Sequence, residues 1–314
     1  MRVLVTGCAG FIGHHLANDL LADGIEVVGV DNLDDYYSVD LKRQNLAVLG
    51  GRPGFHFIYG DLLDPGIQQQ IFTQKPSIVV HLAGRAGVRP SVAHPEVYVR
   101  NNVAVTTELL QLAAHRDVEH FVFASSSSVY GNQKKVPFSE TDPVDQPISP
   151  YAATKRACET ISYAFHHLHG LPVSAVRFFT VYGPRQRPEM AFSLFANAML
   201  RGAPVTLYGD GSTSRDYTYF QDIVDGVRLI MAKPTGHSIV NLGNSSPVTL
   251  REAVDLLARI VGVEPQVEHV PIPPGDVERT FADLDRAASV YGYRPKVSLE
   301  EGLSRFVAYL RTSR

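Results

Sequence analysis

Tryptophan is absent from the 314 residues of this chain, and cysteine occurs only twice. A network of disulfides therefore cannot hold the fold together, and such sparse cysteine favours a reducing compartment, so we expect a cytoplasmic protein. Cys8 falls inside a glycine-rich turn and Cys158 inside an expected helix. We do not expect these two thiols to pair.

An excess of one charge and long apolar runs are also missing. The net charge is -3, which argues against nucleic acid or an anionic membrane as a partner. No apolar run approaches the roughly 20 residues that cross a bilayer. The first expected strand begins at Arg2, so we expect no signal peptide.

Short β-branched runs alternate with amphipathic stretches over the first half of the chain. Strands are expected at Val3–Val5, Val27–Val30, Phe55–Tyr59, Ile78–Leu82, Phe121–Ala124, Val173–Phe178 and Ile239–Leu242. Helices are expected between them, including Phe11–Ala22, Val97–His115 and Tyr151–His169. The strands are apolar on both faces, as in a covered parallel sheet. This pattern predicts an α/β fold with a doubly wound Rossmann sheet.

The alternation breaks after Phe179, where segments rich in Pro, Gly and Arg begin. We expect a Rossmann domain made of residues 1–179 and 238–262. A smaller, discontinuous α/β cap for the substrate would comprise residues 180–237 and 263–314. Ligands in such folds lie beyond the carboxyl ends of the strands, where these loops should converge.

The first strand is followed by Gly7, Gly10 and Gly13, and then by a helix. Glycines at such a turn allow a close backbone approach to a diphosphate at the amino end of the helix. Asp31 ends the second strand, and a carboxylate there accepts bonds from ribose hydroxyls and repels a 2′-phosphate. Asn32 follows it in place of an arginine. We therefore expect NAD rather than NADP.

Two further loops follow strands at the same edge. Asp61 and Leu62 after the third strand would meet the adenine. Leu82, Ala83 and Gly84 after the fourth strand would line the ribose. Taken alone, each of these segments is equally consistent with an ordinary loop.

Tyr151 and Lys155 lie four residues apart in a segment that Pro150 begins, so they share one face of an expected helix. The ammonium can favour the phenolate, which a tyrosine needs in order to act as a base near neutral pH. Tyr130 and Lys134 have the same spacing but lie in an expected loop. The spacing alone is equally consistent with a buried tyrosine and a solvated lysine that have no catalytic role.

Four segments resemble the extended short-chain dehydrogenase/reductases. They are Thr6–Gly13, His81–Gly84, Ser125–Gly131 and the Tyr151-x-x-x-Lys155 pair. Within that superfamily the chain is most similar to nucleotide-sugar 4-epimerases, and among these to UDP-glucuronate 4-epimerases. This second similarity rests on Asp31–Tyr37, Ala86–Arg89, Arg177–Pro184 and Arg187–Ala191. It extends over nearly the whole chain and implies a UDP-sugar substrate and a homodimer paired through the helices expected at Val97–His115 and Tyr151–His169.

The resemblance also implies roles for single residues. Tyr151 would be the base, Lys155 would hold the phenolate and the nicotinamide ribose, and Ser126 would relay the proton. NAD would be retained through each cycle and would also contact Phe11, Ile12, Asn101 and Phe178. We expect no metal, because His166, His167 and His169 have no carboxylate or cysteine to complete a ligand set.

Ser127 and Ser128 distinguish an epimerase from its relatives. Related 4,6-dehydratases carry an Asp-Glu pair at these two positions, and related decarboxylases carry a glutamate at the second. Without a carboxylate near C5, elimination lacks its acid and base. The resemblance therefore favours C4 epimerisation alone.

A substrate carboxylate would need a clamp, for which Thr180, Arg187 and Ser128 are the candidates, with Arg89 as a further cation for the carboxylate or a phosphate. A surface role for Arg187 stays open. The resemblance places Arg215 on a phosphate and Thr206 and Tyr208 beside the uracil. Relatives carry an arginine just before Gly275-Asp276, whereas Pro271–Pro274 has none, so Arg279 would substitute. Thr280 is small and does not exclude an N-acetyl sugar.

Two other functions stay open. Within the enzyme class, the chain could act on UDP-glucose or UDP-N-acetylglucosamine. From a different class, it could be an NAD(H) sensor that keeps only the fold. The intact Tyr151, Lys155 and Ser126 argue against a sensor, which needs no aligned base.

Overall fold

The computed structural model describes residues 1–273 and 275–312. Pro274 and residues 313–314, which belong to the expected cap, lie outside the described residues.

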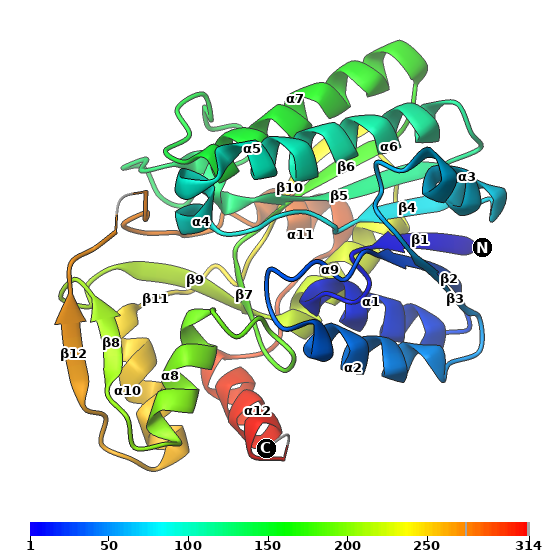
Figure 1. Cartoon of the computed structure of the whole chain (residues 1–314). Coiled ribbons are helices and arrows are strands. Elements are labelled where there is room, and N and C mark those ends of the chain that lie inside the picture. The colour runs from blue at the N-terminus through cyan, green and yellow to red at the C-terminus, as the bar shows by residue number, and fades with distance from the viewer. Residues whose placement is uncertain (274, 313–314) are drawn as a thin grey trace.

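A seven-stranded sheet forms the centre of the larger part of the molecule (Figure 1). Its strands are β1 (Arg2–Thr6), β2 (Glu26–Asp31), β3 (Phe55–Tyr59), β4 (Ile78–His81), β5 (His120–Ser126), β6 (Val173–Phe178) and β10 (His237–Leu242). Their order is β3-β2-β1-β4-β5-β6-β10, and every neighbouring pair is parallel. All seven expected strands are in this sheet, which confirms the predicted fold class.

Helices cover both faces of this sheet. On one face lie α1 (Phe11–Ala22), α2 (Val39–Gly50), α9 (Phe220–Met231) and α11 (Asp285–Tyr291). On the other lie α3 (Pro65–Thr73), α4 (Val88–Ala93), α5 (Pro95–Tyr98), α6 (Val105–Ala114) and α7 (Pro150–His169). Alternate strand residues enter the two cores, with Val3 and Val5 on one side and Leu4 on the other. The strands are therefore apolar on both faces because both faces are covered.

A smaller layer lies beyond the carboxyl edge of the sheet. It contains β7 (Thr180–Tyr182), β9 (Ser214–Tyr219) and β11 (Pro247–Thr249) in one sheet, with β8 (Val205–Tyr208) and β12 (Val267–Val270) in another. Helices α8 (Ala191–Met199), α10 (Leu250–Val261) and α12 (Leu299–Thr312) pack on these strands around an aromatic core that includes Phe192, Phe195 and Phe306.

Three helices pack outside the ranges expected for their domains. Helix α11 lies within the expected cap range, yet Ala287 and Tyr291 pack into the core of the large sheet. Helix α9 lies within the expected cap range, yet Ile223, Val224 and Val227 pack into the core of the large sheet. Helix α10 lies within the expected Rossmann range, yet Val254 and Leu257 pack in the cap core. Helices α9 and α10 are amphipathic, and an amphipathic pattern shows which face of a helix is buried without showing which sheet covers it.

The helix expected over Val97–His115 is present, but its middle part is π-helical rather than α-helical. The chain passes from α5 into a π-helical segment, Val99–Ala104, and from there into α6. π-helical turns are rare and often lie at functional sites. The wider turn carries Asn101 and Asn102, and the contacts of Asn102 described below account for it.

Within the described residues, no helix is long and apolar enough to cross a membrane. Both cysteines are buried free thiols, as expected from their positions in the sequence.

Candidate active site

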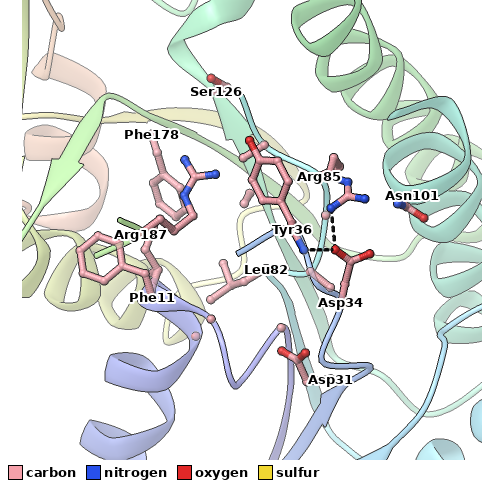
Figure 2. A pocket seen from close by; sticks show the side chains of 18 of the residues that line it. Phe11, Asp31, Asp34, Tyr36, Leu82, Arg85, Asn101, Ser126, Phe178 and Arg187 are labelled. Carbon is pink, nitrogen blue, oxygen red and sulfur yellow. Dashed lines mark hydrogen bonds and ion pairs between the residues drawn. The ribbon is translucent and has the colours of Figure 1, made fainter. Parts of the chain in front are cut away.

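A cavity of about 410 Å³ opens where the carboxyl ends of the central strands meet (Figure 2). It is lined by all the residues expected to bind NAD: Gly7, Gly10, Phe11, Ile12, Gly13, Asp31, Asn32, Asp61, Leu62, Leu82, Ala83, Gly84, Asn101, Tyr151, Lys155 and Phe178. It is also lined by Ser126, Ser127, Ser128, Thr180 and Arg187. Residues at the ends of β1 to β6 thus share one hollow with residues of α1, α7 and two short helical segments.

The glycine-rich turn leaves no room for side chains at two positions. Gly7 has a φ of +69°, and a Cβ there would lie 2.8 Å from the backbone nitrogen of Ala83. A Cβ on Gly13 would lie 2.2 Å from the carbonyl oxygen of Gly7. The turn is therefore pressed against both the helix it starts and the loop after β4. The amino end of α1 then faces the cavity, as a dinucleotide diphosphate requires.

Asp31 lies at the end of β2 and is 9% exposed. Its carboxylate accepts hydrogen bonds from the backbone nitrogens of Ala9, at 3.1 Å, and Leu33, at 2.8 Å. Burial raises the pKa of this carboxyl, while the two amides and Lys42 oppose the rise. A carboxylate held in this way can still accept bonds from two ribose hydroxyls, because each oxygen has a second lone pair.

The Tyr151–Lys155 pair lies in the first turns of α7. Ser149 caps this helix by accepting a bond from the backbone nitrogen of Ala152, and Pro150 occupies the first turn. Lys155 is 8% exposed, and its Nζ donates to the carbonyl oxygen of Ala124 at 2.8 Å. The two side chains therefore share one face of a fixed helix at the cavity wall.

The serines at the end of β5 form the adjoining wall. Ser126 Oγ accepts a bond from the backbone nitrogen of Ser128 at 3.1 Å and donates to Ser128 Oγ at 3.1 Å, so it caps the short 3-10 helix Ser127–Tyr130. Among the described lining residues, the carboxylates are Asp31, Asp34 and Asp61. These three follow β2 and β3, away from the serine wall, where a carboxylate would be needed for elimination.

Arg187 enters the cavity from the loop between β7 and α8. Figure 2 shows it beside Phe11 and Phe178, with Asp34, Arg85 and Asn101 on the other side of the hollow. Its Nη1 lies 3.2 Å from Oε1 of Glu189. The guanidinium also lies 5.8 Å from the centre of the Tyr36 ring. A cation thus lines the cavity on the side away from Asp34, Arg85 and Asn101.

The loop that carries Arg187 rests on the glycine-rich turn. Arg185 Nη1 donates to Asn45 Oδ1 at 2.6 Å, and Asn45 Nδ2 donates to the carbonyl oxygen of Ala9 at 2.9 Å. His15 Nε2 lies 2.9 Å from the carbonyl oxygen of Pro184. Burial lowers the pKa of His15 to about 4, so the ring is neutral at pH 7 and stabilises this loop through the contact.

Sequence reasoning assigned no role to three residues in the cavity. Arg85 Nη1 donates to Asp34 Oδ1 at 2.5 Å, and its guanidinium lies 4.8 Å from the centre of the Tyr36 ring. The backbone nitrogen of Tyr36 donates to the same Asp34 oxygen at 2.8 Å. The positions of Asp34 and Arg85 just after β2 and β4 could have indicated them, since both strands end at this edge.

The π-helical turn supports the same loop. Asn102 is 1% exposed, and its Oδ1 accepts from the backbone nitrogen of Arg85 at 2.8 Å. Its Nδ2 donates to the carbonyl oxygen of Arg85 and to Thr154 Oγ1, both at 3.0 Å. One amide therefore joins the loop after β4 to the residue next to Lys155. A Cβ on Gly84 would lie 2.9 Å from Asn102 Oδ1, so the loop passes close to it.

Five residues expected to hold the nucleotide do not line this cavity. Arg89 Nη2 donates to Asp276 Oδ2 at 2.7 Å and stacks over Tyr208 at 4.0 Å from the ring centre. Arg215 Nη1 donates to the carbonyl oxygen of Ser214 at 2.9 Å. Arg279 lines a separate cavity of about 250 Å³, and Thr206 is exposed on β8. Their roles stay predictions.

Thr280, which we expect not to exclude an N-acetyl sugar, has its hydroxyl hydrogen-bonded within the fold. It is 4% exposed, and its Oγ1 accepts from the backbone nitrogen of Asp216 at 3.0 Å. Among the described residues, no group of three or more His, Cys, Asp or Glu side chains is arranged to hold a metal.

Comparison with known proteins identifies relatives over the whole length of the chain. The model of the NAD dependent epimerase/dehydratase family matches residues 3–243. The chain is 42% identical over 306 residues to the UDP-glucuronate 4-epimerase of Thermodesulfobacterium geofontis, covering 97% of this chain and 94% of that protein. The structure is similar to that of the UDP-glucuronic acid 4-epimerase of Bacillus cereus in complex with UDP-glucuronic acid and NAD, with a TM-score of 0.95, 34% identity and complete coverage of both chains. It is also similar to the UDP-glucose 4-epimerase of Thermotoga maritima, with a TM-score of 0.92, 34% identity and coverage of 100% of this chain and 99% of that one.

Proposed function

The chain belongs to the NAD dependent epimerase/dehydratase family, and we propose that it interconverts UDP-glucuronate and UDP-galacturonate by inverting C4. One observation carries the proposal. A single cavity contains the NAD-binding turn, the Tyr151–Lys155 pair and Arg187. Among the described residues that line the cavity, the serine wall carries none of the carboxylates that further chemistry at C5 would need.

The residues of the chain supply the acid–base part of the reaction. Lys155, held by the carbonyl of Ala124, favours the phenolate of Tyr151. Tyr151 accepts the proton of the sugar 4-hydroxyl, and Ser126 relays it. NAD, when bound against the glycine-rich turn, Asp31 and Lys155, would supply the hydride acceptor and donor for C4. The 4-keto sugar turns about its diphosphate between the two transfers, and Tyr151 then returns the proton.

Arg187 is the reason for proposing UDP-glucuronate, rather than a neutral UDP-sugar, as the substrate. Oxidation of UDP-glucuronate at C4 produces a β-keto acid, which loses carbon dioxide unless its carboxylate is held. Arg187 grips that carboxylate with two parallel bonds, and Thr180 and Ser128 add hydroxyl donors. The loop that carries Arg187 is held in place beside the glycine-rich turn, because Asn45 and His15 bond to it.

The purified protein, assayed without added NAD, tests this function. We expect UDP-glucuronate to give a mixture with UDP-galacturonate on anion-exchange chromatography, with little turnover of UDP-glucose or UDP-N-acetylglucosamine. Turnover of the neutral sugars alone would refute the clamp. Release of carbon dioxide or of a 4-keto-6-deoxy sugar would instead identify a decarboxylase or a dehydratase.

Three further parts of the proposal concern the nucleotide site, the oligomeric state and the cellular compartment. The nucleotide lies between the Rossmann part and the discontinuous cap, near Arg215 and Tyr208. Two copies pair through the α5–α6 and α7 surface, which sedimentation can test. The enzyme works in the cytoplasm, in keeping with its free thiols.

A further inference from the structure

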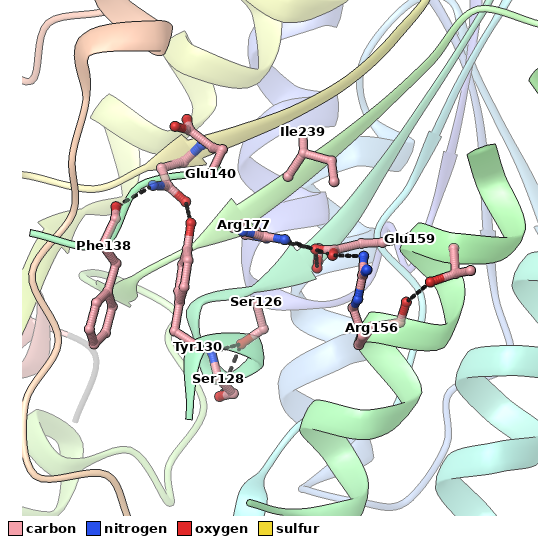
Figure 3. A network of polar contacts seen from close by, with 12 residues as sticks. Ser126, Ser128, Tyr130, Phe138, Glu140, Arg156, Glu159, Arg177 and Ile239 are labelled. Atoms are coloured by element: carbon pink, nitrogen blue, oxygen red, sulfur yellow. Dashed lines mark hydrogen bonds and ion pairs between the residues drawn. The ribbon is translucent and has the colours of Figure 1, made fainter. Parts of the chain in front are cut away.

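A buried ion pair lies directly behind the cavity wall (Figure 3). Arg177 on β6 donates from Nε to Oε1 of Glu159 on α7 at 2.8 Å, and from Nη2 to Oε2 at 2.9 Å. The two side chains are 1% and 0% exposed. Ser125 Oγ donates to Oε1 at 2.6 Å, and Arg156 reaches Oε2 from the other side at 3.3 Å. Both carboxylate oxygens are thus occupied.

Stability alone is a poor explanation for such a pair. Two charges lose their hydration on burial, and well-packed apolar residues of similar volume often serve the fold equally well or better. Removal of one partner is different, because it leaves the other charge buried and uncompensated. A pair of this kind fixes a geometry that apolar contacts would leave loose.

The position of the pair shows which geometry it fixes. Glu159 lies one turn beyond Lys155 on the same face of α7. Ser125 stands between Ala124, whose carbonyl holds Lys155, and Ser126. Arg177 is paired with Ser125 across β5 and β6, and the next pair in the register is Ser126 with Phe178.

Each member of the network is therefore connected, directly or through one helical turn, to a residue of the cavity wall.

A second set of contacts extends from Arg177 away from the cavity. The Arg177 guanidinium lies 4.7 Å from the centre of the Tyr130 ring, and Tyr130 donates to Asn241 Oδ1 at 2.7 Å. Asn241 Nδ2 donates to the carbonyl oxygen of Phe138 at 2.8 Å. These contacts hold the end of β10 and the segment after the serines. Arg177 therefore connects the ends of β5, β6 and β10.

We propose that Glu159 and Arg177 are positioning residues for the reaction. They hold α7 against the ends of β5 and β6, so that the Tyr151 hydroxyl, the Lys155 ammonium and the Ser126 hydroxyl keep one spacing. The pair does not reach the cavity, so it affects the rate of the chemical step and leaves ligand binding unchanged. This inference rests on the proposed epimerase function.

The test compares Arg177→Met, Glu159→Leu and the double variant Glu159→Leu/Arg177→Met. The double variant removes both charges and keeps the volume. We expect it to melt at a higher temperature than either single variant, to retain NAD and to keep KM within about threefold of wild type. Its kcat should fall about tenfold or more, because a small misplacement of reacting groups is enough for such a loss. The pH below which kcat falls should also move upward, since Lys155 no longer supports the phenolate.

A matched control separates positioning from stability. Asp222 on α9 is 3% exposed and accepts bonds from the backbone nitrogens of Lys296 and Val297, at 2.9 and 3.1 Å. Asp222→Asn should lower the melting temperature and leave kcat and its pH profile unchanged. A double variant with wild-type kcat and pH profile would overturn the proposal.

Two further measurements keep the proposal open to refutation if the double variant fails to fold or if the substrate is wrong. Ser125→Ala removes a single bond and should lower kcat about threefold, with rescue by Ser125→Thr. An unchanged kcat in Ser125→Ala would count against the network. Amide hydrogen exchange over residues 150–156 should rise in the Ser125→Ala and double variants but not in Asp222→Asn, with or without turnover. Unchanged exchange overturns the positioning role, whereas absence of wild-type turnover refutes only the proposed function.

Discussion

The two ends of the ligand site differ in how they are built. On the cofactor side, Gly7, Asp31 and Lys155 are held by backbone contacts within one cavity. On the expected nucleotide side, Arg89 and Asp276 form an ion pair across the boundary between the sheet and the cap, with side chains 44% and 20% exposed. The first arrangement is rigid before any ligand arrives. The second consists of exposed charges that can exchange one partner for another at little cost in free energy.

The largest expected effect lies at the rigid end. Tyr151→Phe removes the hydroxyl and keeps the ring, which packs edge-on against Tyr98 at 6.1 Å between centroids. We expect kcat to fall about 10³-fold, within the range for loss of a general base. Bound NAD, measured after heat release, should stay at the wild-type amount. A Tyr151→Phe enzyme with more than a tenth of wild-type turnover would contradict the mechanism.

Arg187→Met sharpens the comparison, because Arg187 lies on a loop held by the glycine-rich turn and lines the cavity where we propose the sugar binds. Loss of a charge-assisted bond to a carboxylate should lower kcat/KM for UDP-glucuronate by about 10- to 100-fold. Any activity toward UDP-glucose should change little, since that sugar has no carboxylate. Arg201→Met on the cap surface, where Arg201 only contacts its own helix region, is the control. Equal losses for both sugars would contradict a carboxylate clamp.

The rigid end should also respond to acid. His81 is 3% exposed between Thr6 and Thr106, and burial, followed by the charge of Lys155, lowers its pKa to about 3. The unfolded chain binds a proton near pH 6.5 and the folded protein does not, so stability falls as the pH drops below about 6.5. Between pH 7.5 and 5.0 this histidine should remove about 2 kcal/mol from the free energy of unfolding.

Urea unfolding at the two pH values measures this effect. His81→Gln keeps two polar contacts but cannot take up the proton, so its pH response should be smaller by that amount. His269→Gln, at an exposed position on β12, is the control. If His81→Gln responds to pH as the wild type does, the buried neutral histidine is not the cause.

The smallest effect is expected at the exposed end. Asp276→Asn breaks the ion pair with Arg89, and an exposed pair of this kind is worth about 1 kcal/mol or less. The free energy of unfolding should change by no more than that, and by less still in 1 M salt. A loss of several kcal/mol would mean that the two ends are equally rigid, and the comparison would fail.

The same difference decides what could be predicted from the sequence. The glycine-rich turn and the tyrosine–lysine pair are local patterns, in which spacing along the chain dictates spacing in the structure. Asp34 and Arg85 are 51 residues apart, and Asn45 and Arg185 are 140 apart. The position of Asp34 and Arg85 after two strands can place them at the edge of the sheet, but no local pattern shows which distant segments pair there.

The packing of α9 and α10 and the π-helical segment within the expected helix over Val97–His115 show the same limit. Amphipathic periodicity predicted that helices were present and which faces were buried. It did not indicate which sheet a helix covers, and it did not indicate a π-helical turn, whose cause is the contact of Asn102 with two segments distant in sequence.

That widened turn has a consequence for insertions and deletions in this chain. A residue added to an α-helix rotates everything after it by about 100°. Shortening Val99–Ala104 by one residue would restore a regular helix at the local level, and on propensity alone it should be tolerated. It would nonetheless turn either α5 or α6 away from its neighbours, and the Asn102 amide would lose its hydrogen bonds to Arg85 and Thr154. Natural variation in length should therefore spare this stretch and accumulate in outer loops such as 50–54.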